Sequence, residues 1–232
     1  MSNYFINIEL LSDTTFGRGD GVAGLIDQEV EHDSYGFPYL RGRTLKGLLS
    51  EECDNLLCLI PDPQEHWLNA RNSLLGKAGS TIETQSRMHV GDACLPDDLR
   101  REVAKQFELE KYRGKITLTP TDILSSLTTF RRQTAIDSKE GVAKDKSLRS
   151  SRVVLRELCF KAPITLNLKP SDDSQKILAL LAVSVLALRR IGSGRNRGRG
   201  HVKCTLWQRQ ENQNPEEITT KHLRYLEQET KA

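Results

Sequence analysis

The chain has 232 residues, of which 37% are hydrophobic and 28% charged, and its formal net charge is +3. These values are typical of a soluble globular protein with one large domain or two small ones, and the longest apolar run, residues 177–188, is too short to cross a bilayer. The N-terminal residues have no signal-peptide pattern and the five cysteines contain no CxxC pair, so we expect a cytoplasmic protein with free thiols.

The first third of the chain predicts two strands and two helices. Residues Tyr4–Leu11 alternate in hydrophobicity and predict the first strand. A helix is predicted from Thr44, a suitable N-cap, until Pro61 ends it. Residues 67–75 predict a short helix, and residues 87–93 a second strand.

The middle of the chain is less regular. Residues 97–109 predict a helix and residues 115–118 a short strand. Residues 128–151 are polar, basic and weakly periodic, which predicts a protruding loop or hairpin, and residues 153–168 predict one long strand or a broken pair.

The last third predicts a buried helix and a final strand. The helix is expected from Ser171 to Ile191, with Gly192 ending it, because the sequence is apolar nearly all round. Residues 201–208 predict a strand and residues 216–229 a short helix.

Without the insertions, the predicted order is strand, helix, strand, strand, helix, strand. This order is that of the split βαβ, ferredoxin-like (RRM-like) α+β fold. We therefore expect one domain over residues 1–210, with the hairpin of residues 128–151 and other insertions, and a connector or docking helix in residues 211–232.

The stretch from residue 192 to residue 200 is the most informative segment. It contains four glycines and three arginines without an acidic residue, and the candidate binding residues in it are Gly192, Gly194, Arg195, Arg197, Gly198 and Arg199. Glycine lets backbone N–H groups approach a ligand, and the arginine guanidinium matches the geometry of a phosphate. The loop follows a helix and precedes a strand, the reverse of the dinucleotide-binding order, so a polyphosphate chain such as RNA is favoured.

Two further basic segments are candidate phosphate sites. At the start of the first helix, Thr44, Lys46 and Gly47 lie where unpaired N–H groups favour an anion, although a solvated lysine is the alternative for Lys46. Arg41 and Arg43 make the same segment more basic and are further candidate RNA contacts. In the hairpin, Arg131, Arg132 and Arg149 are candidate RNA contacts or simply solvate an exposed loop.

These segments resemble one known family. Residues 191–204 resemble the glycine-rich loop of the RAMP superfamily, the RNA-binding proteins of CRISPR systems. Residues 37–49 look like that family's Pro-Ile-Pro-Gly-Ser-Ser-Leu-Lys-Gly segment, with Arg41 and Arg43 as departures that make it more basic. Residues 132–156 are similar to the thumb hairpin of backbone subunits in type III CRISPR effector complexes.

The resemblance implies a function and a catalytic residue. It implies a backbone subunit that binds guide RNA and target RNA beside other effector subunits, with Arg18 as a further RNA contact. Asp27 matches the position of the family's catalytic aspartate and would bind Mg²⁺ or orient a ribose 2′-OH, so the protein would be an endoribonuclease within the complex. The alternatives are a turn-capping role for Asp27, a non-catalytic subunit that caps the guide end, and a guide-processing endoribonuclease.

One further group of residues has metal-ligand chemistry. Zinc occurs in some relatives, and the candidate ligands are Cys53, Cys58, His66, His89 and Cys94. Their spacing is irregular, so we expect buried thiols and no zinc.

Overall fold

The computed structural model describes residues 4–21, 26–60, 65–77, 79, 85–137, 139–144, 147–210 and 213–231. Pro61, which was predicted to end the first helix, lies outside the described residues, as do the residues 22–25 that precede the Asp27 segment.

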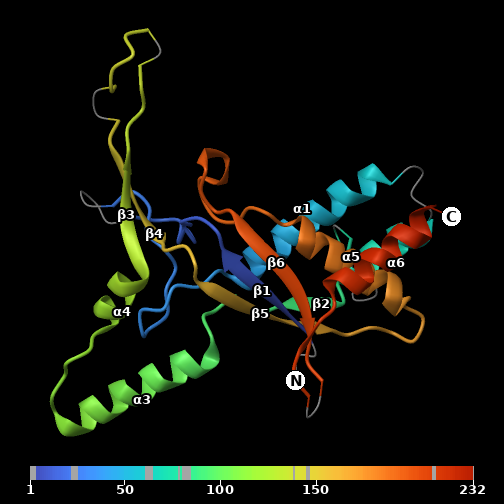
Figure 1. The fold of residues 1–232 in the computed structure, drawn as a ribbon, viewed down its shortest axis with the longest axis horizontal. Coiled ribbons are helices and arrows are strands. Elements are labelled where there is room, and N and C mark those ends of the chain that lie inside the picture. Colours follow the sequence, from blue (N-terminus) through green and yellow to red (C-terminus); the bar gives the residue numbers. More distant parts are fainter. Residues whose placement is uncertain are drawn as a thin grey trace.

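A five-stranded antiparallel sheet forms the centre of the protein (Figure 1). Its strands, in spatial order, are β2 (Met88–Val90), β5 (Cys159–Leu166), β1 (Tyr4–Leu10), β6 (Val202–Gln208) and β7 (Glu216–Glu217). β1 pairs along its length with both β5 and β6, as the strong alternation of its sequence predicts.

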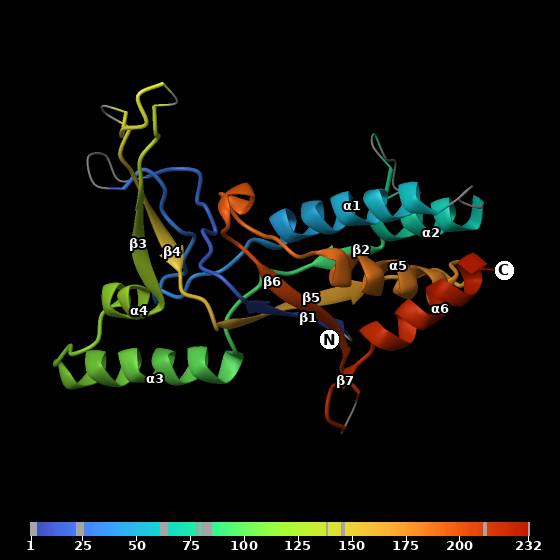
Figure 2. The same ribbon diagram turned by 45° about the horizontal axis from the view of Figure 1, so that its top comes forward.

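Helices cover one face of this sheet. They are α1 (Gly42–Leu59), α2 (Glu65–Leu75), α5 (Ser174–Ala187) and α6 (Thr219–Lys231), and Figure 2 shows them together on one side of the strands. Ile6, Ile8 and Leu10 of β1 point into the core beneath them and are fully buried. α5 is buried on nearly all sides because α1, α2, α6 and β6 all pack on it.

The order of these elements confirms the predicted fold. β1, α1, β2, β5, α5 and β6 form the strand–helix–strand–strand–helix–strand series. The connection through α1 leads from β1 past β5 to β2, and the connection through α5 leads from β5 past β1 to β6. The protein is thus an α+β, ferredoxin-like protein.

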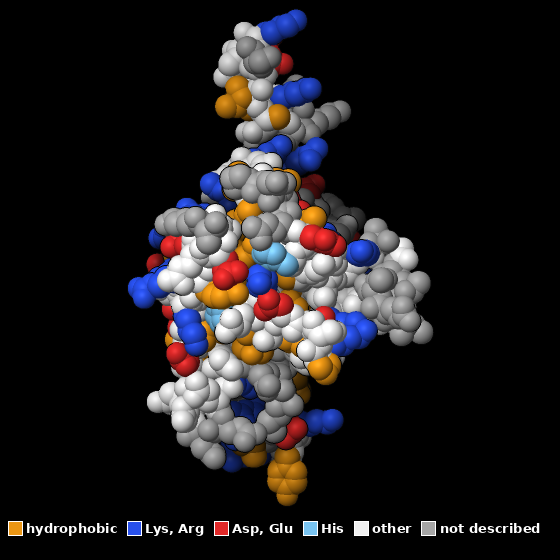
Figure 3. Space-filling view, turned by 90° about the vertical axis from the view of Figure 1, so that its right-hand side faces the viewer, with side chains coloured by type: hydrophobic (Ala, Val, Ile, Leu, Met, Phe, Trp, Pro, Cys, Tyr) orange, Lys and Arg blue, Asp and Glu red, His pale blue; other side chains and the backbone are white. Residues whose placement is uncertain are grey.

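A second, two-stranded sheet forms the projecting hairpin. β3 (Thr128–Gln133) pairs with β4 (Arg149–Val154), as predicted for this segment. Figure 3 shows the hairpin extending beyond the rest of the molecule, with Lys and Arg side chains along it. Two helices precede it, α3 (Asp97–Arg113) and α4 (Pro120–Leu127), and Figure 1 shows α3 away from the central sheet.

The region between α3 and the hairpin differs from the prediction. Residues 115–118 form no strand, because the Glu110 carboxylate accepts hydrogen bonds from the backbone N–H groups of Thr117 and Leu118 and holds this segment against α3. α4 was not predicted, although Thr119 and Asp122 form a capping box at its start.

The boundaries of the two core helices also differ. α1 begins at Gly42 and not at Thr44, because the carboxylate of Asp92 accepts the N–H of Gly42 at 2.7 Å. α5 begins after Asp173, whose side chain accepts the N–H of Lys176. It ends at Ala187 and not at Ile191, because the N–H of Ile191 pairs with the carbonyl of Gly200.

The stretch 153–168 is the broken pair, one of its two predicted forms, in which β4 ends at Val154 and β5 begins at Cys159. The predicted helix over 216–229 begins only at Thr219, because Glu216 and Glu217 extend the sheet as β7.

The C-terminal helix belongs to the same packed body. α6 packs on α5, and Ile218 with the partly buried Tyr225 and Leu226 joins the core. Whether α6 also docks on another subunit stays a prediction. Within the described residues, no helix combines the length and the apolar character that a membrane span needs.

Candidate nucleic-acid interface

The glycine- and arginine-rich loop has a fixed shape. Residues Arg195–Arg197 form a short 3-10 helix, η1, with glycines in the left-handed region on both sides. Gly200 also has a positive φ, and a Cβ there would lie 1.9 Å from the carbonyl oxygen of Ile191, so this position requires glycine. The loop is held to the segment after β1, because the N–H of Ser193 donates to the carbonyl of Thr15 and that of Gly200 to the carbonyl of Asp13.

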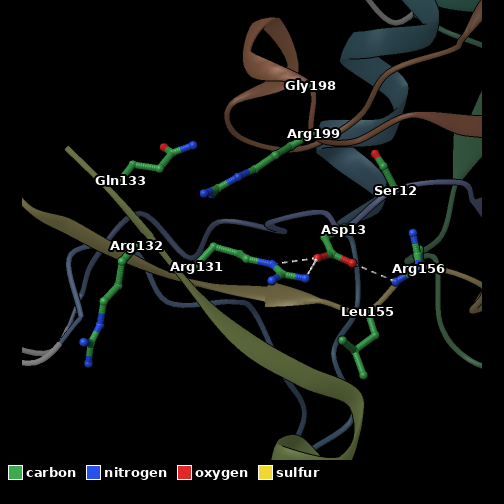
Figure 4. A pocket seen from close by; sticks show the side chains of 9 residues that line it. All are labelled: Ser12, Asp13, Arg131, Arg132, Gln133, Leu155, Arg156, Gly198 and Arg199. Carbon is green, nitrogen blue, oxygen red and sulfur yellow. Dashed lines mark hydrogen bonds and ion pairs between the residues drawn. The ribbon is translucent and has the colours of Figure 1, made fainter. Parts of the chain in front are cut away.

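The loop and the hairpin together line a cavity of about 550 Å³. Its lining consists of side chains from the loop, the hairpin and the segment after β1: Ser12, Asp13, Arg131, Arg132, Gln133, Leu155, Arg156, Gly198 and Arg199. In Figure 4, Arg199 reaches from the loop toward the hairpin, while Arg131 reaches toward Asp13. The fold thus brings together two basic segments that are more than sixty residues apart in sequence.

The electrostatics of this cavity favour an anion. Burial and the neighbouring cations Arg131 and Arg197 lower the pKa of Arg199, against an opposing effect of Asp13. Among the described residues that line the cavity, Asp13 is the one acidic side chain, and it already accepts hydrogen bonds from Arg131. A bound phosphate would therefore reduce the repulsion between these arginines.

Arg197 faces a second space along the hairpin. A cavity of about 690 Å³ is lined by Arg197 together with Gln133 of β3, Arg149 of β4 and residues between the two strands, among them Lys144. Both cavities lie between the loop and the hairpin, so the basic surface is continuous from Arg199 to Arg149.

On its other side the loop meets the start of α1. A cavity of about 280 Å³ is lined by Arg41 and Thr44 from the helix start and by Gly192, Ser193 and Arg195 from the loop. The two predicted phosphate motifs therefore converge.

Two arginines of that cavity have acidic partners. Arg41 forms an ion pair of 2.8 Å with Glu31, and Arg195 lies 3.4 Å from Glu51. Burial would raise the pKa of Glu31, but hydrogen bonds from Arg41 and Tyr39 outweigh it and hold this pKa below its usual value. Glu31 thus stays charged and orients Arg41.

Lys46 is turned away from this convergence. Its ammonium group donates to Ser86 Oγ at 2.7 Å and to the carbonyl of Met88 at 2.9 Å, and burial lowers its pKa. It lines a separate cavity of about 350 Å³ beside β2. Arg43 is exposed on α1, and Arg18 is exposed and pairs with Asp20 at 3.1 Å.

Asp27 lies beside the first residues of β4 in the hairpin. Its backbone N–H donates to the carbonyl of Ser150, and its carboxylate Oδ2 accepts the N–H of Ser150 at 2.6 Å. The residue is exposed. Nearby, Glu29 forms a largely buried ion pair of 2.8 Å with Arg152, which fixes the same loop to β4.

The described residues do not form a prepared metal site. No group of three His, Cys, Asp or Glu side chains in the described part of the chain is arranged to hold an ion, around Asp27 or among Cys53, Cys58, His66, His89 and Cys94. Cys53 lies in the core and Cys58 is exposed. A magnesium ion at Asp27 would need ligands from outside the described residues, such as RNA oxygens, and it stays a prediction.

Two residues of the interface were missed by the sequence analysis. Asp13 links the hairpin to the loop, and Arg156 lines the cavity beside it. Arg156 could have been found from its place at the end of the basic hairpin segment. Asp13 lies in a polar loop, and its sequence context does not distinguish it from the other residues there.

The fold and the site define an antiparallel split-βαβ protein whose glycine-rich loop, first-helix start and projecting hairpin form one basic surface. The sequence model of the RAMP superfamily matches residues 7–203, so the chain belongs to that superfamily. No curated protein sequence matches the chain.

Solved structures show the same fold. Two similar chains come from cryo-EM structures of the type III-B Cmr-beta, one bound to cognate target RNA (14% identity) and one in the apo state (16% identity). Each comparison gives a TM-score of 0.59 and covers 88% of this chain and 96% of the other chain.

Proposed function

We propose that the chain is a guide-RNA-binding backbone subunit of a type III CRISPR effector complex, with target RNA and other effector subunits as partners. Membership in the RAMP superfamily and the likeness to chains of the type III-B Cmr-beta support this proposal. The observation that carries it is the convergence of the loop and the hairpin on a cavity where the described lining residues include four arginines and one acid. Phosphate contacts by such side chains supply most of the affinity for an RNA backbone.

The salt dependence of RNA binding tests the loop. For single-stranded RNA the log–log slope is about −0.7 per neutralised phosphate, so replacing Arg195, Arg197 and Arg199 by Ala should flatten it by about 2. A matched variant removes three exposed cations of α3, Arg101, Lys105 and Lys111, and should leave the slope unchanged. A slope that is the same in the loop variant and the wild type would overturn the assignment of the loop.

We further propose that Asp27 takes part in cleavage of target RNA. Its exposure and its place beside the projecting hairpin support this role, because the hairpin is the segment similar to the thumb of type III backbone subunits. A carboxylate there would orient a ribose 2′-OH for attack on the adjacent phosphorus, with the 5′-oxygen as leaving group. The products would be a 2′,3′-cyclic phosphate and a 5′-hydroxyl end.

Two variants separate catalysis from a structural role of Asp27. Asp27→Ala should abolish target cleavage in the assembled complex, whereas Ser150→Ala keeps the backbone donor to Asp27 and should keep cleavage. If Asp27→Ala retains every cut, the chain is a non-catalytic or capping subunit. If the purified chain cuts repeat RNA without partners, it is a guide-processing enzyme.

A further inference from the structure

The face of the central sheet opposite the helices carries an aromatic pair surrounded by cations. Because side chains alternate along a strand, Phe5, Asn7 and Glu9 of β1 point to the face that α1 and α5 do not cover. The register places Trp207 and Pro163 beside Phe5. Of the described residues that line the cavities of the loop and the hairpin, none lies on this face.

The two rings form a stacked platform. The ring centroids of Phe5 and Trp207 lie 6.0 Å apart with an interplanar angle of 15°. Trp207 Nε1 donates to Thr205 Oγ1 at 2.9 Å, which fixes the orientation of the indole. Phe5 is only 5% exposed, whereas Trp207 is half-buried, so the indole is the ring available to a ligand.

Cations lie around this platform. The charged ends of Lys161 and Arg209 lie 5.6 Å and 5.5 Å from the centroid of the Phe5 ring. Lys161 and Lys203 are exposed on β5 and near the start of β6. Two acids lie on the neighbouring strands: Glu9 of β1 is opposite Lys203, and Glu217 of β7 is opposite Trp207. Glu217 already accepts the N–H of Thr219.

We infer that this open sheet face binds a single-stranded RNA segment, at a second site separate from the loop and hairpin. Trp207 stacks on one base, and Lys161, Lys203 and Arg209 contact the adjoining phosphates. An open antiparallel sheet with a partly exposed indole and neighbouring cations provides both interactions that single-stranded RNA offers, stacking and charge. The cations favour RNA over an apolar protein partner.

Tryptophan fluorescence tests this site without relying on the loop. The chain has two tryptophans, and Trp67 is buried, so a Trp67→Phe variant reports on Trp207 alone. Addition of a ten-nucleotide oligouridine should quench the fluorescence of Trp207. Trp207→Ala should weaken oligouridine binding about tenfold, because it removes the ring on which a base stacks, and Trp207→Phe should restore most of the binding.

The controls separate this inference from the proposed function. The double variant Lys161→Ala with Lys203→Ala should flatten the salt slope of the fluorescence titration by about 1.4. The triple loop variant should leave the quenching unchanged even if it abolishes guide binding. The second site would be overturned if oligouridine did not quench the fluorescence, or if the loop variant abolished the quenching while the Lys161→Ala, Lys203→Ala variant kept it. A fluorescence change that requires a protein subunit and not RNA would also overturn it.

Discussion

Arg131 donates two hydrogen bonds, from Nε at 2.9 Å and from Nη2 at 2.6 Å, to the same carboxylate oxygen of Asp13. The other carboxylate oxygen accepts the N–H of Arg156, and the Asp13 carbonyl accepts the N–H of Gly200. Asp13, in the segment after β1, therefore connects the hairpin, the turn before β5 and the glycine-rich loop. It holds the hairpin and the loop together with the backbone hydrogen bonds of Thr14 to Val154 and of Thr15 to Ser193.

Asp13→Ala should loosen the base of the hairpin. We expect a loss of about 1 kcal/mol in the free energy of unfolding, because Arg131 is exposed and water screens the pair. Trypsin should cut faster after Arg131 and Arg132. Asp20→Ala removes an exposed partner of Arg18 and should change neither measurement; equal effects of the two variants would contradict this role of Asp13.

Alanine at Gly200 should be far more harmful than alanine at Gly198. Both glycines have positive φ, which costs a side chain about 1–2 kcal/mol. A Cβ at Gly198 meets nothing within 4 Å, whereas one at Gly200 collides with the Ile191 carbonyl. Urea unfolding should show the larger loss for Gly200→Ala, and a similar loss for both would mean that the loop readjusts freely.

Lys46→Met should lower stability without changing RNA binding. The variant keeps the aliphatic chain but loses the hydrogen bonds to Ser86 and Met88, at an expected cost of about 1–3 kcal/mol. The salt slope of RNA binding should stay the same. A slope flatter by about 0.7 would show instead that Lys46 contacts a phosphate. Arg43→Met, at an exposed site on the same helix, is the control for stability.

The contact between Glu110 and residues 117–118 should depend on pH. Hydrogen bonds from the Thr117 side chain and from the backbone N–H groups of Leu118 and Thr117 lower the pKa of Glu110 from 4.5 to about 2. Because the folded-state pKa is depressed, this stabilisation is complete above about pH 4.5 and is lost as the pH falls toward 2. Hydrogen exchange should show falling protection of the two amides in that window, and Glu110→Gln should remove the pH dependence.

Cysteine reactivity should divide the thiols into two groups. Burial raises the pKa of Cys204 to about 12 and that of Cys53 to about 11. A thiol reagent at pH 8 should label the exposed Cys58 and Cys159 first and reach Cys53 and Cys204 only after unfolding. Mass spectrometry of the labelled native protein checks this, and early labelling of Cys204 would contradict its place beneath the helices.

Much of the architecture was predictable from the sequence. Hydrophobicity alternates along β1 because one face of the strand is buried, and α5 is apolar all round because the helix is buried on nearly all sides. The order of the core elements could therefore be predicted from the local periodicity of the sequence. The composition of the loop likewise indicated a phosphate-binding surface, because glycine and arginine have conformational and chemical properties that do not depend on the fold.

The tertiary structure decided where elements end and what charged groups face. α1 begins at Gly42 because the carboxylate of Asp92, fifty residues away in sequence, accepts its N–H. Residues 115–118 form no strand because the Glu110 carboxylate accepts the N–H groups of Thr117 and Leu118. Lys46 has a phosphate-binding pattern in sequence, yet its ammonium group is satisfied by β2. Periodicity is a property of neighbouring residues, whereas hydrogen-bond partners and charge pairs are chosen among residues that only folding brings together.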